Sequence, residues 1–288
     1  MSDPSVEQLL IRHAHAVDAH LHRLLARVSD AFFIPDGDSF VSTDWTRGPW
    51  DPRSQHAGPS SALLGRAFER LEPAGLQVAR FTIEILKPIP IGRLTVVAKP
   101  VRTGRRVQFA EATLTAGDEL IARASAWRIK STDGRVQPTP DEAPPFAGPL
   151  DSKSFDTPVA WNPERAPSYL TAMEWRFARG TFLETGPASA WMRMRHPLVE
   201  GEEIAPLSRV LIAADSGNGI SSEADFEKYV YINTELSVHL TRMPEGEWVC
   251  LDAVTRIDAS GVGLAQSILW DERARIGGGA QSLLVAPR

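Results

Sequence analysis

The sequence contains a single cysteine, Cys250, and no excess of positive charge. One cysteine excludes an internal disulfide framework and a zinc site built from cysteines. The 31 Lys and Arg residues are outnumbered by 36 Asp and Glu residues, which gives a net charge of -5. Because nucleic-acid binding requires clustered positive charge, we expect no nucleic-acid partner. A small molecule is the expected ligand.

Long hydrophobic runs are also missing. No apolar stretch approaches the roughly 20 residues that a membrane-spanning helix requires, so the sequence predicts no membrane span. The N-terminus shows no basic segment followed by an apolar core, so we predict no secretory signal and expect a cytoplasmic protein. There is no Gly-x-Ser-x-Gly elbow either, which argues against a covalent serine hydrolase.

The composition is that of a soluble globular chain, and the length fits two ordinary domains or one large one. Of its 288 residues, 43% are hydrophobic and 23% are charged. Residues 5–28 have near-helical apolar spacing and carry four histidines, and a polar helix face is favoured there over a metal site. A proline-rich stretch that cannot sustain a helix suggests an interdomain linker. We therefore predict an N-terminal extension over residues 1–30, a first domain over 31–135, a linker over 136–168 and a second domain over 169–288.

The two predicted domains resemble each other. In each, a helix is followed by a series of alternating strands, with SSALLGRAFERL as the first helix and APLSRVLIAAD as the second. Residues 109–111 match residues 264–266 at an offset of 155, and residues 90–92 match residues 244–246 at an offset of 154. The two offsets differ by only one residue, and this regularity indicates a duplicated α+β unit. A single helix wrapped by a curved antiparallel sheet is the simplest way to bury the apolar face of each unit.

Four segments carry a resemblance to a known family. They are RGPWDPRSQHAGP at residues 47–59, ADSGNG at 214–219, INTELSVH at 232–239 and GAQSL at 279–283. Together they resemble the double-hotdog acyl-CoA thioesterases, the group that includes bacterial acyl-CoA thioesterase II. The resemblance covers roughly residues 31–287. It implies an α+β double hotdog, with two tandem units that each wrap a curved sheet around a central helix.

The resemblance also implies a reaction and its residues. An acyl-CoA thioester is hydrolysed by a water held by an Asp, a hydroxyl or amide residue, and a Gln, with no cofactor or metal. These positions fall on Asp215, Asn233 and Gln281, with Thr234 as the alternative for the second. We expect Asp215 to be the general base and the acyl chain to lie between sheet and helix. The first-half counterparts of Asp215 and Gln281 are Ala67 and Ala126, an asymmetry that packing alone does not require.

The residues themselves leave alternatives open. The first helix is preceded by His56, Ala57 and Gly58. Either the backbone N–H groups in this region face a thioester oxygen, or these residues only form a tight turn and an N-terminal cap. A second enzyme hypothesis is hydration or dehydration of an acyl thioester, which needs a His and an acid. A third is a non-catalytic acyl-CoA or lipid-binding protein. Sheet edges that stay unpaired also favour a homo-oligomer.

Overall fold

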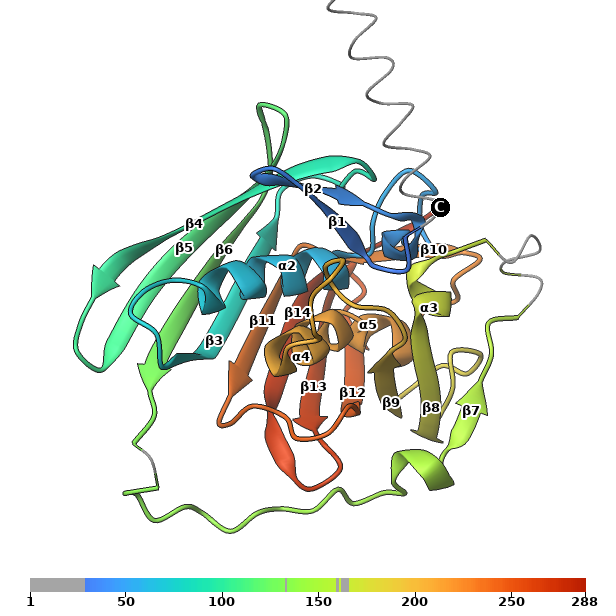
Figure 1. The fold of residues 1–288 in the computed structure, drawn as a ribbon. Helices are drawn as coiled ribbons and strands as arrows, with labels where there is room; N and C mark the ends of the chain where they lie inside the picture. Colours follow the sequence, from blue (N-terminus) through green and yellow to red (C-terminus); the bar gives the residue numbers. More distant parts are fainter. Residues whose placement is uncertain (1–28, 133, 159–160, 162–165) are drawn as a thin grey trace, which may run out of the picture.

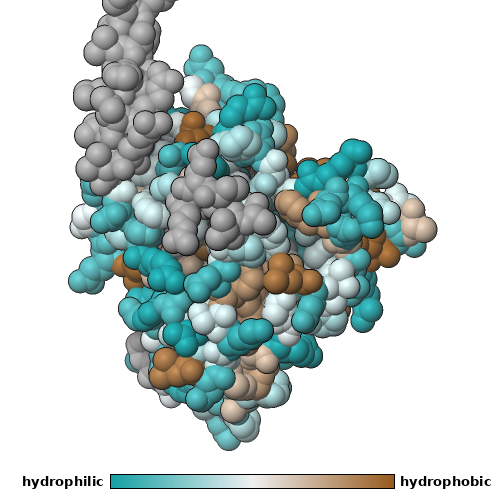
Figure 2. All heavy atoms as spheres, turned by 90° about the vertical axis from the view of Figure 1, so that its right-hand side faces the viewer, coloured by the Kyte–Doolittle hydropathy of each residue, from teal (hydrophilic) through white to brown (hydrophobic). Residues whose placement is uncertain are grey.

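The computed structural model describes residues 29–288 except residues 133, 159–160 and 162–165 (Figure 1). The predicted helix over residues 5–28 lies outside the described residues. Among the helices that are described, none has both the length and the apolar character that a membrane crossing needs. The face seen in Figure 2 is mainly hydrophilic, with small separate hydrophobic patches.

The fold is α+β, with one large antiparallel sheet and few helices. The first half contains β1 (Phe33–Asp36), β2 (Ser39–Ser42), the 3-10 helix η1 (Asp44–Thr46), α2 (Ala57–Glu69), β3 (Leu76–Ile85), β4 (Arg93–Thr103), β5 (Val107–Ala116) and β6 (Glu119–Lys130). The remainder contains η2 (Pro149–Asp151), β7 (Lys153–Phe155), α3 (Tyr169–Ala172), β8 (Met173–Arg179), β9 (Ala188–Met194), α4 (Pro206–Ala214), α5 (Gly217–Ile220), β10 (Tyr229–Asn233), β11 (Glu235–Leu240), β12 (Val249–Ile257), β13 (Val262–Trp270) and β14 (Arg275–Pro287).

All of these strands belong to one sheet of 14 strands, in the order β1-β2-β4-β5-β6-β3-β11-β14-β13-β12-β9-β8-β7, with β10 paired to β14. The two halves of the chain join where β3 pairs antiparallel with β11, with Thr82 opposite Ser237. Along β5, the predicted alternation is confirmed, because Ala110, Ala112 and Leu114 are buried while the residues between them are not.

Both predicted helices are confirmed, and they pack against each other inside the curve of the sheet (Figure 1). Two glycines of α2 allow this close approach. A Cβ at Gly58 would lie 2.4 Å from the backbone oxygen of Ile212, and a Cβ at Gly65 would lie 2.4 Å from a methyl carbon of Leu211. The α2–α4 contact therefore brings the start of α2 close to the end of α4.

The proline-rich stretch contains more structure than a plain linker. It includes η2 and the short edge strand β7, which pairs with β8. Phe146 packs edge-on against Trp191 and Trp270, and Trp191 Nε1 donates a hydrogen bond of 2.8 Å to the carbonyl of Ala147. Composition alone does not reveal these contacts, because proline excludes helix and central strand but permits an edge strand.

Candidate active site

Asp215 caps the C-terminus of α4 and is almost fully buried, with 3% of its surface exposed. Helix α4 begins at Pro206, whose fixed φ suits the first turn, and it continues through an apolar run. After Asp215 and Ser216 the chain starts the short helix α5. A buried carboxylate at this point needs hydrogen-bond donors, because an unpaired buried charge is costly.

Two side-chain amides supply such donors. Asn233 Nδ2 donates to Asp215 Oδ1 at 2.9 Å, and Gln281 Nε2 lies 3.3 Å from the same oxygen. Asn233 ends β10 and pairs with Leu283 of β14, so that Gln281, two residues before Leu283, lies on the same face of the sheet. The three polar residues that the sequence singles out therefore meet at one carboxylate oxygen.

The amide of Gln281 is held at both ends. Its Oε1 accepts a hydrogen bond of 3.0 Å from the backbone N–H of Asn218, and its Nε2 also donates to the backbone oxygen of Asp215 at 3.1 Å. Gly217 leaves room for it, since a Cβ there would lie 2.9 Å from Gln281 Oε1. Helix α5, which the sequence did not predict, thus fixes which way the amide points.

His56 brings the first half of the chain to this site. It is the N-cap residue of α2, and its Nδ1 accepts a hydrogen bond of 3.1 Å from the backbone N–H of Gly58. The same nitrogen lies 3.0 Å from Asp215 Oδ2. No acidic partner for His56 was identified from the sequence, because His56 and Asp215 are far apart in the chain and meet only through the packing of α2 on α4.

Tyr169, which sequence reasoning missed, supports the imidazole. Its ring stacks on His56 at a centroid distance of 3.7 Å. Its hydroxyl donates to the backbone oxygen of Ile212 at 2.7 Å and lies 2.8 Å from Ser216 Oγ. Burial raises the pKa of the Tyr169 hydroxyl well above its ordinary value, so this group stays protonated and serves as a hydrogen-bond donor. No motif in the sequence marks this residue.

The other predicted site residues lie near Asp215 in the structure but do not bond to its carboxylate. Thr234, between β10 and β11, is exposed, and its hydroxyl donates to the carbonyl of Ser282 at 3.4 Å. Of the two candidates for the second polar position, Asn233 is the one that contacts Asp215. Ala57 and Gly58, which were expected to precede the first helix, are instead its first two residues, because α2 begins at Ala57 and not at Ser60.

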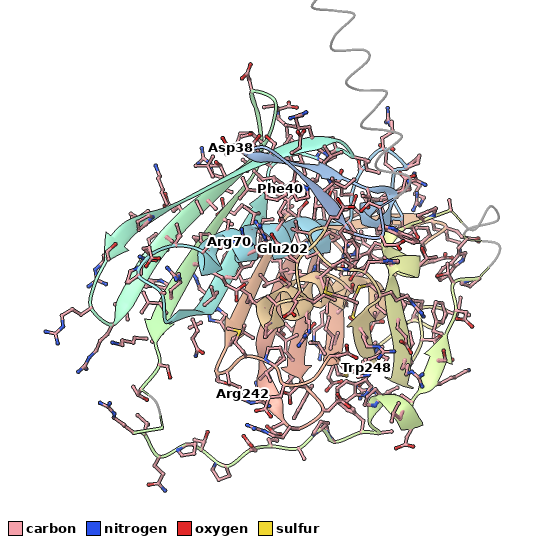
Figure 3. The ribbon with its side chains drawn as sticks, viewed as in Figure 1. Asp38, Phe40, Arg70, Glu202, Arg242 and Trp248 are labelled. Atoms are coloured by element: carbon pink, nitrogen blue, oxygen red, sulfur yellow. The ribbon has the colours of Figure 1, made fainter. Side chains whose placement is uncertain are left out.

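The described structure also has two surface pockets away from Asp215. An open pocket of about 900 Å³ lies at the ends of β12 and β14, and one of about 380 Å³ lies between α2 and the β1–β2 hairpin, where Figure 3 labels Phe40, Arg70 and Glu202. Neither pocket is lined by the three polar residues. The space between helix and sheet, where the acyl chain was expected, is occupied by fully buried side chains such as Phe81 and Ile83.

Solved structures with the same fold include three that extend along most of this chain. A Novosphingobium aromaticivorans protein provisionally assigned as a thioesterase is 21% identical, covers 88% of this chain and 98% of its own, and has a TM-score of 0.69. A hot dog fold protein of unknown function from Alicyclobacillus acidocaldarius is 15% identical, with coverages of 91% and 98% and a TM-score of 0.68. An acyl-CoA thioesterase II from Mycobacterium marinum is 12% identical, with coverages of 88% and 93% and a TM-score of 0.59. At such identities the likeness shows the fold alone, which is the hot dog fold.

No curated protein matches the chain. Two family models do. The model of the acyl-CoA thioesterase N-terminal domain matches residues 46–129, and that of the acyl-CoA thioesterase C-terminal domain matches residues 140–285. Together they cover most of the sequence and both of its halves. The chain therefore belongs to the acyl-CoA thioesterase family.

Proposed function

We propose that this protein hydrolyses acyl-CoA thioesters to a free acid and CoA, and that Asp215, Asn233 and Gln281 hold the attacking water. The observation that carries the proposal is the meeting of two amides from β10 and β14 at one oxygen of a buried carboxylate. An ionised carboxylate accepts up to about four hydrogen bonds. With Asn233 and Gln281 on Oδ1 and His56 Nδ1 3.0 Å from Oδ2, Oδ2 retains one acceptor position for a water.

The proposed reaction needs no covalent intermediate. The water oxygen attacks the thioester carbonyl carbon while Asp215 takes one of its protons, and the carbonyl oxygen becomes an oxyanion. The carbon–sulfur bond then breaks, and the CoA sulfur leaves with the proton as a thiol. Backbone N–H groups at Ala57 and Gly58 are the proposed donors to the oxyanion. Because thioesters are reactive, positioning a water and stabilising this charge supply the required acceleration.

We further propose that the fold is a double hotdog built from residues 31–135 and 169–288, with residues 136–168 between the units and residues 1–30 outside them. The sheet register supports this division. Thr82 lies opposite Ser237 where the halves join, and these residues are 155 apart in sequence. The pair Ala110–Ala126 in the first half has its counterpart 155 residues later in the pair Ala265–Gln281. We also propose that the protein associates with copies of itself through sheet edges.

Release of free thiol tests the proposed hydrolysis. A panel of acyl-CoAs of increasing chain length is offered to the wild-type protein, to Asp215→Asn and to Asp118→Asn. Asp118 is an exposed residue of the β5–β6 turn and serves as the matched control. We expect Asp215→Asn to lose activity on the order of 100-fold or more and Asp118→Asn to keep it. Equal rates for the two variants would remove Asp215 from the mechanism.

A second reaction is favoured by one specific observation. Hydration of a 2-enoyl-CoA requires an acid–base pair that takes a proton from water and delivers one to the carbon next to the carbonyl. His56 and Asp215, 3.0 Å apart, form such a pair. Loss of the enoyl absorbance without release of thiol identifies hydration, whereas release of thiol identifies hydrolysis.

A third proposal, acyl-CoA or lipid binding without catalysis, makes the opposite forecast for the same panel. In that case the ligands raise the melting temperature of the protein, by more for a tighter ligand at equal concentration, and no product forms.

A further inference from the structure

The Nδ1 atom of His56 has two neighbours that make incompatible demands on it. The N–H of Gly58, 3.1 Å away, needs a lone pair on this nitrogen. Asp215 Oδ2, 3.0 Å away, is an acceptor when ionised and needs a proton between the two atoms. A ring nitrogen carries either a lone pair or a proton, so it satisfies only one of these neighbours at a time.

The ring is not free to rotate between them. Its face is stacked on Tyr169 at an angle of 11°, and the backbone N–H of His56 donates to the carbonyl of Thr46 at 2.8 Å. The imidazole has 15% of its side chain exposed, and Asp215 has 3%. A proton, and not a movement of the side chain, therefore decides which neighbour Nδ1 bonds.

We propose that His56 temporarily accepts, from Asp215, the proton that Asp215 takes from the attacking water. This inference rests on the proposed hydrolysis and adds a residue to it. Before the reaction, Nδ1 is unprotonated and accepts from Gly58. Asp215 Oδ2 lies 3.0 Å from Nδ1, so a proton taken up by the carboxylate has the ring nitrogen as its next acceptor.

The steps of this relay balance. As the water oxygen bonds to the carbonyl carbon, the water proton passes to Asp215 and from there to Nδ1, which leaves a carboxylate and an imidazolium. Nδ1 no longer accepts from Gly58, whose N–H becomes available to the oxyanion that has just formed. When the carbon–sulfur bond breaks, the proton returns through Asp215 to the departing sulfur, and His56 is neutral again.

The alternative is that His56 only caps α2, and His56→Asn separates the two roles. The Oδ1 of asparagine branches from the same carbon position as Nδ1, and asparagine is a preferred N-cap residue, so the variant keeps an acceptor for Gly58. An amide does not take up a proton at neutral pH. We expect His56→Asn to retain the melting temperature of the wild type and to lose about 100-fold in kcat. His239→Asn, on an exposed histidine of β11, is the control.

Chemical rescue supplies the second measurement. His56→Ala leaves a space beside Tyr169, and added imidazole restores its kcat by about tenfold or more if the ring acts as a proton acceptor. Imidazole should restore His56→Asn less than His56→Ala, because the asparagine side chain occupies part of the space that the ring leaves. Wild-type activity in His56→Asn overturns the relay, and so does a failure of imidazole to rescue His56→Ala. A wild-type protein that releases no thiol from any acyl-CoA refutes the proposed function instead.

Discussion

Replacement of Gly217 by alanine should disable the site from a position that touches no substrate, whereas the same change at Gly219 should not. Both glycines lie in the four-residue helix α5, so each variant gains at most about 1 kcal/mol of helix propensity. They differ in the space around the new methyl group. At Gly217 it would lie 2.7 Å from Ser267 Oγ and 2.9 Å from Gln281 Oε1, whereas at Gly219 the nearest atom is 3.9 Å away.

The size of the effect follows from these distances. To avoid the methyl, Gln281 Oε1 must move by several tenths of an ångström, which weakens its 3.0 Å bond from Asn218 and turns Nε2 away from Asp215. Displacing one prepositioned donor costs on the order of 100-fold in kcat. Overpacking costs about 1–3 kcal/mol, so after the gain in helix propensity Gly217→Ala should be less stable by about 0–3 kcal/mol.

Thiol release and urea denaturation measure the two effects separately. Gly219→Ala should keep the wild-type kcat and gain up to about 1 kcal/mol in the free energy of unfolding. If Gly217→Ala hydrolyses acyl-CoA as fast as Gly219→Ala does, the position of the Gln281 amide is irrelevant to the reaction and the reasoning fails.

Three further predictions concern stability and reactivity. Urea denaturation should show a larger loss, about 1–3 kcal/mol, for Gly58→Ala than for Gly65→Ala, because the new methyl meets a backbone carbonyl in the first case and a leucine side chain in the second. Asp271 is fully buried and accepts a hydrogen bond of 2.7 Å from Arg242, so Asp271→Asn should lower the free energy of unfolding by about 3–5 kcal/mol. Burial alone would raise the pKa of Asp271, but hydrogen bonds from Arg242 and from backbone N–H groups hold this pKa below its ordinary value of 3.8. The stabilisation by Asp271 is therefore complete above pH 3.8 and is lost as the pH falls further. Acid titration of the wild type and of Asp271→Asn measures this loss. Burial raises the pKa of the Cys250 thiol, so an aromatic disulfide reagent should react with Cys250 only after unfolding and should not disturb the thiol-release assay.

Periodicity predicted the central elements of the fold because burial on one face leaves a regular pattern in the sequence. The alternation in β5 and the apolar run of α4 are examples. Short elements were missed. Helix α5 has four residues, two of them glycine, and β7 has three residues within a proline-rich stretch. Neither is long enough to show a period, and both depend on contacts with distant strands.

Some residues of the candidate site were predicted and others were missed, because only some of them have a local signal in the sequence. Asp215 stands out locally, as a carboxylate at the end of an apolar helix, and Gln281 as an amide in an apolar strand. The choice between Asn233 and Thr234 depends on strand register, which adjacent residues in one sequence do not settle. The chain leaves β10 after Asn233 and enters β11 at Glu235, and this break places Asn233 inward and Thr234 outward. The support of His56 by Tyr169 is purely tertiary and left no local signal.

The asymmetry between the two halves explains why one chain would hold one site. Ala126, the counterpart of Gln281, is fully buried opposite Phe81 and Ala110, so an amide there would have to find partners inside an apolar core. The first half nevertheless contributes to the other site, because His56 at the start of α2 lies against Asp215 at the end of α4. The proposed hydrolysis would therefore use both halves, one for the imidazole and the N–H groups of α2 and the other for the carboxylate and the amides. Either half expressed alone should consequently be inactive even if it folds.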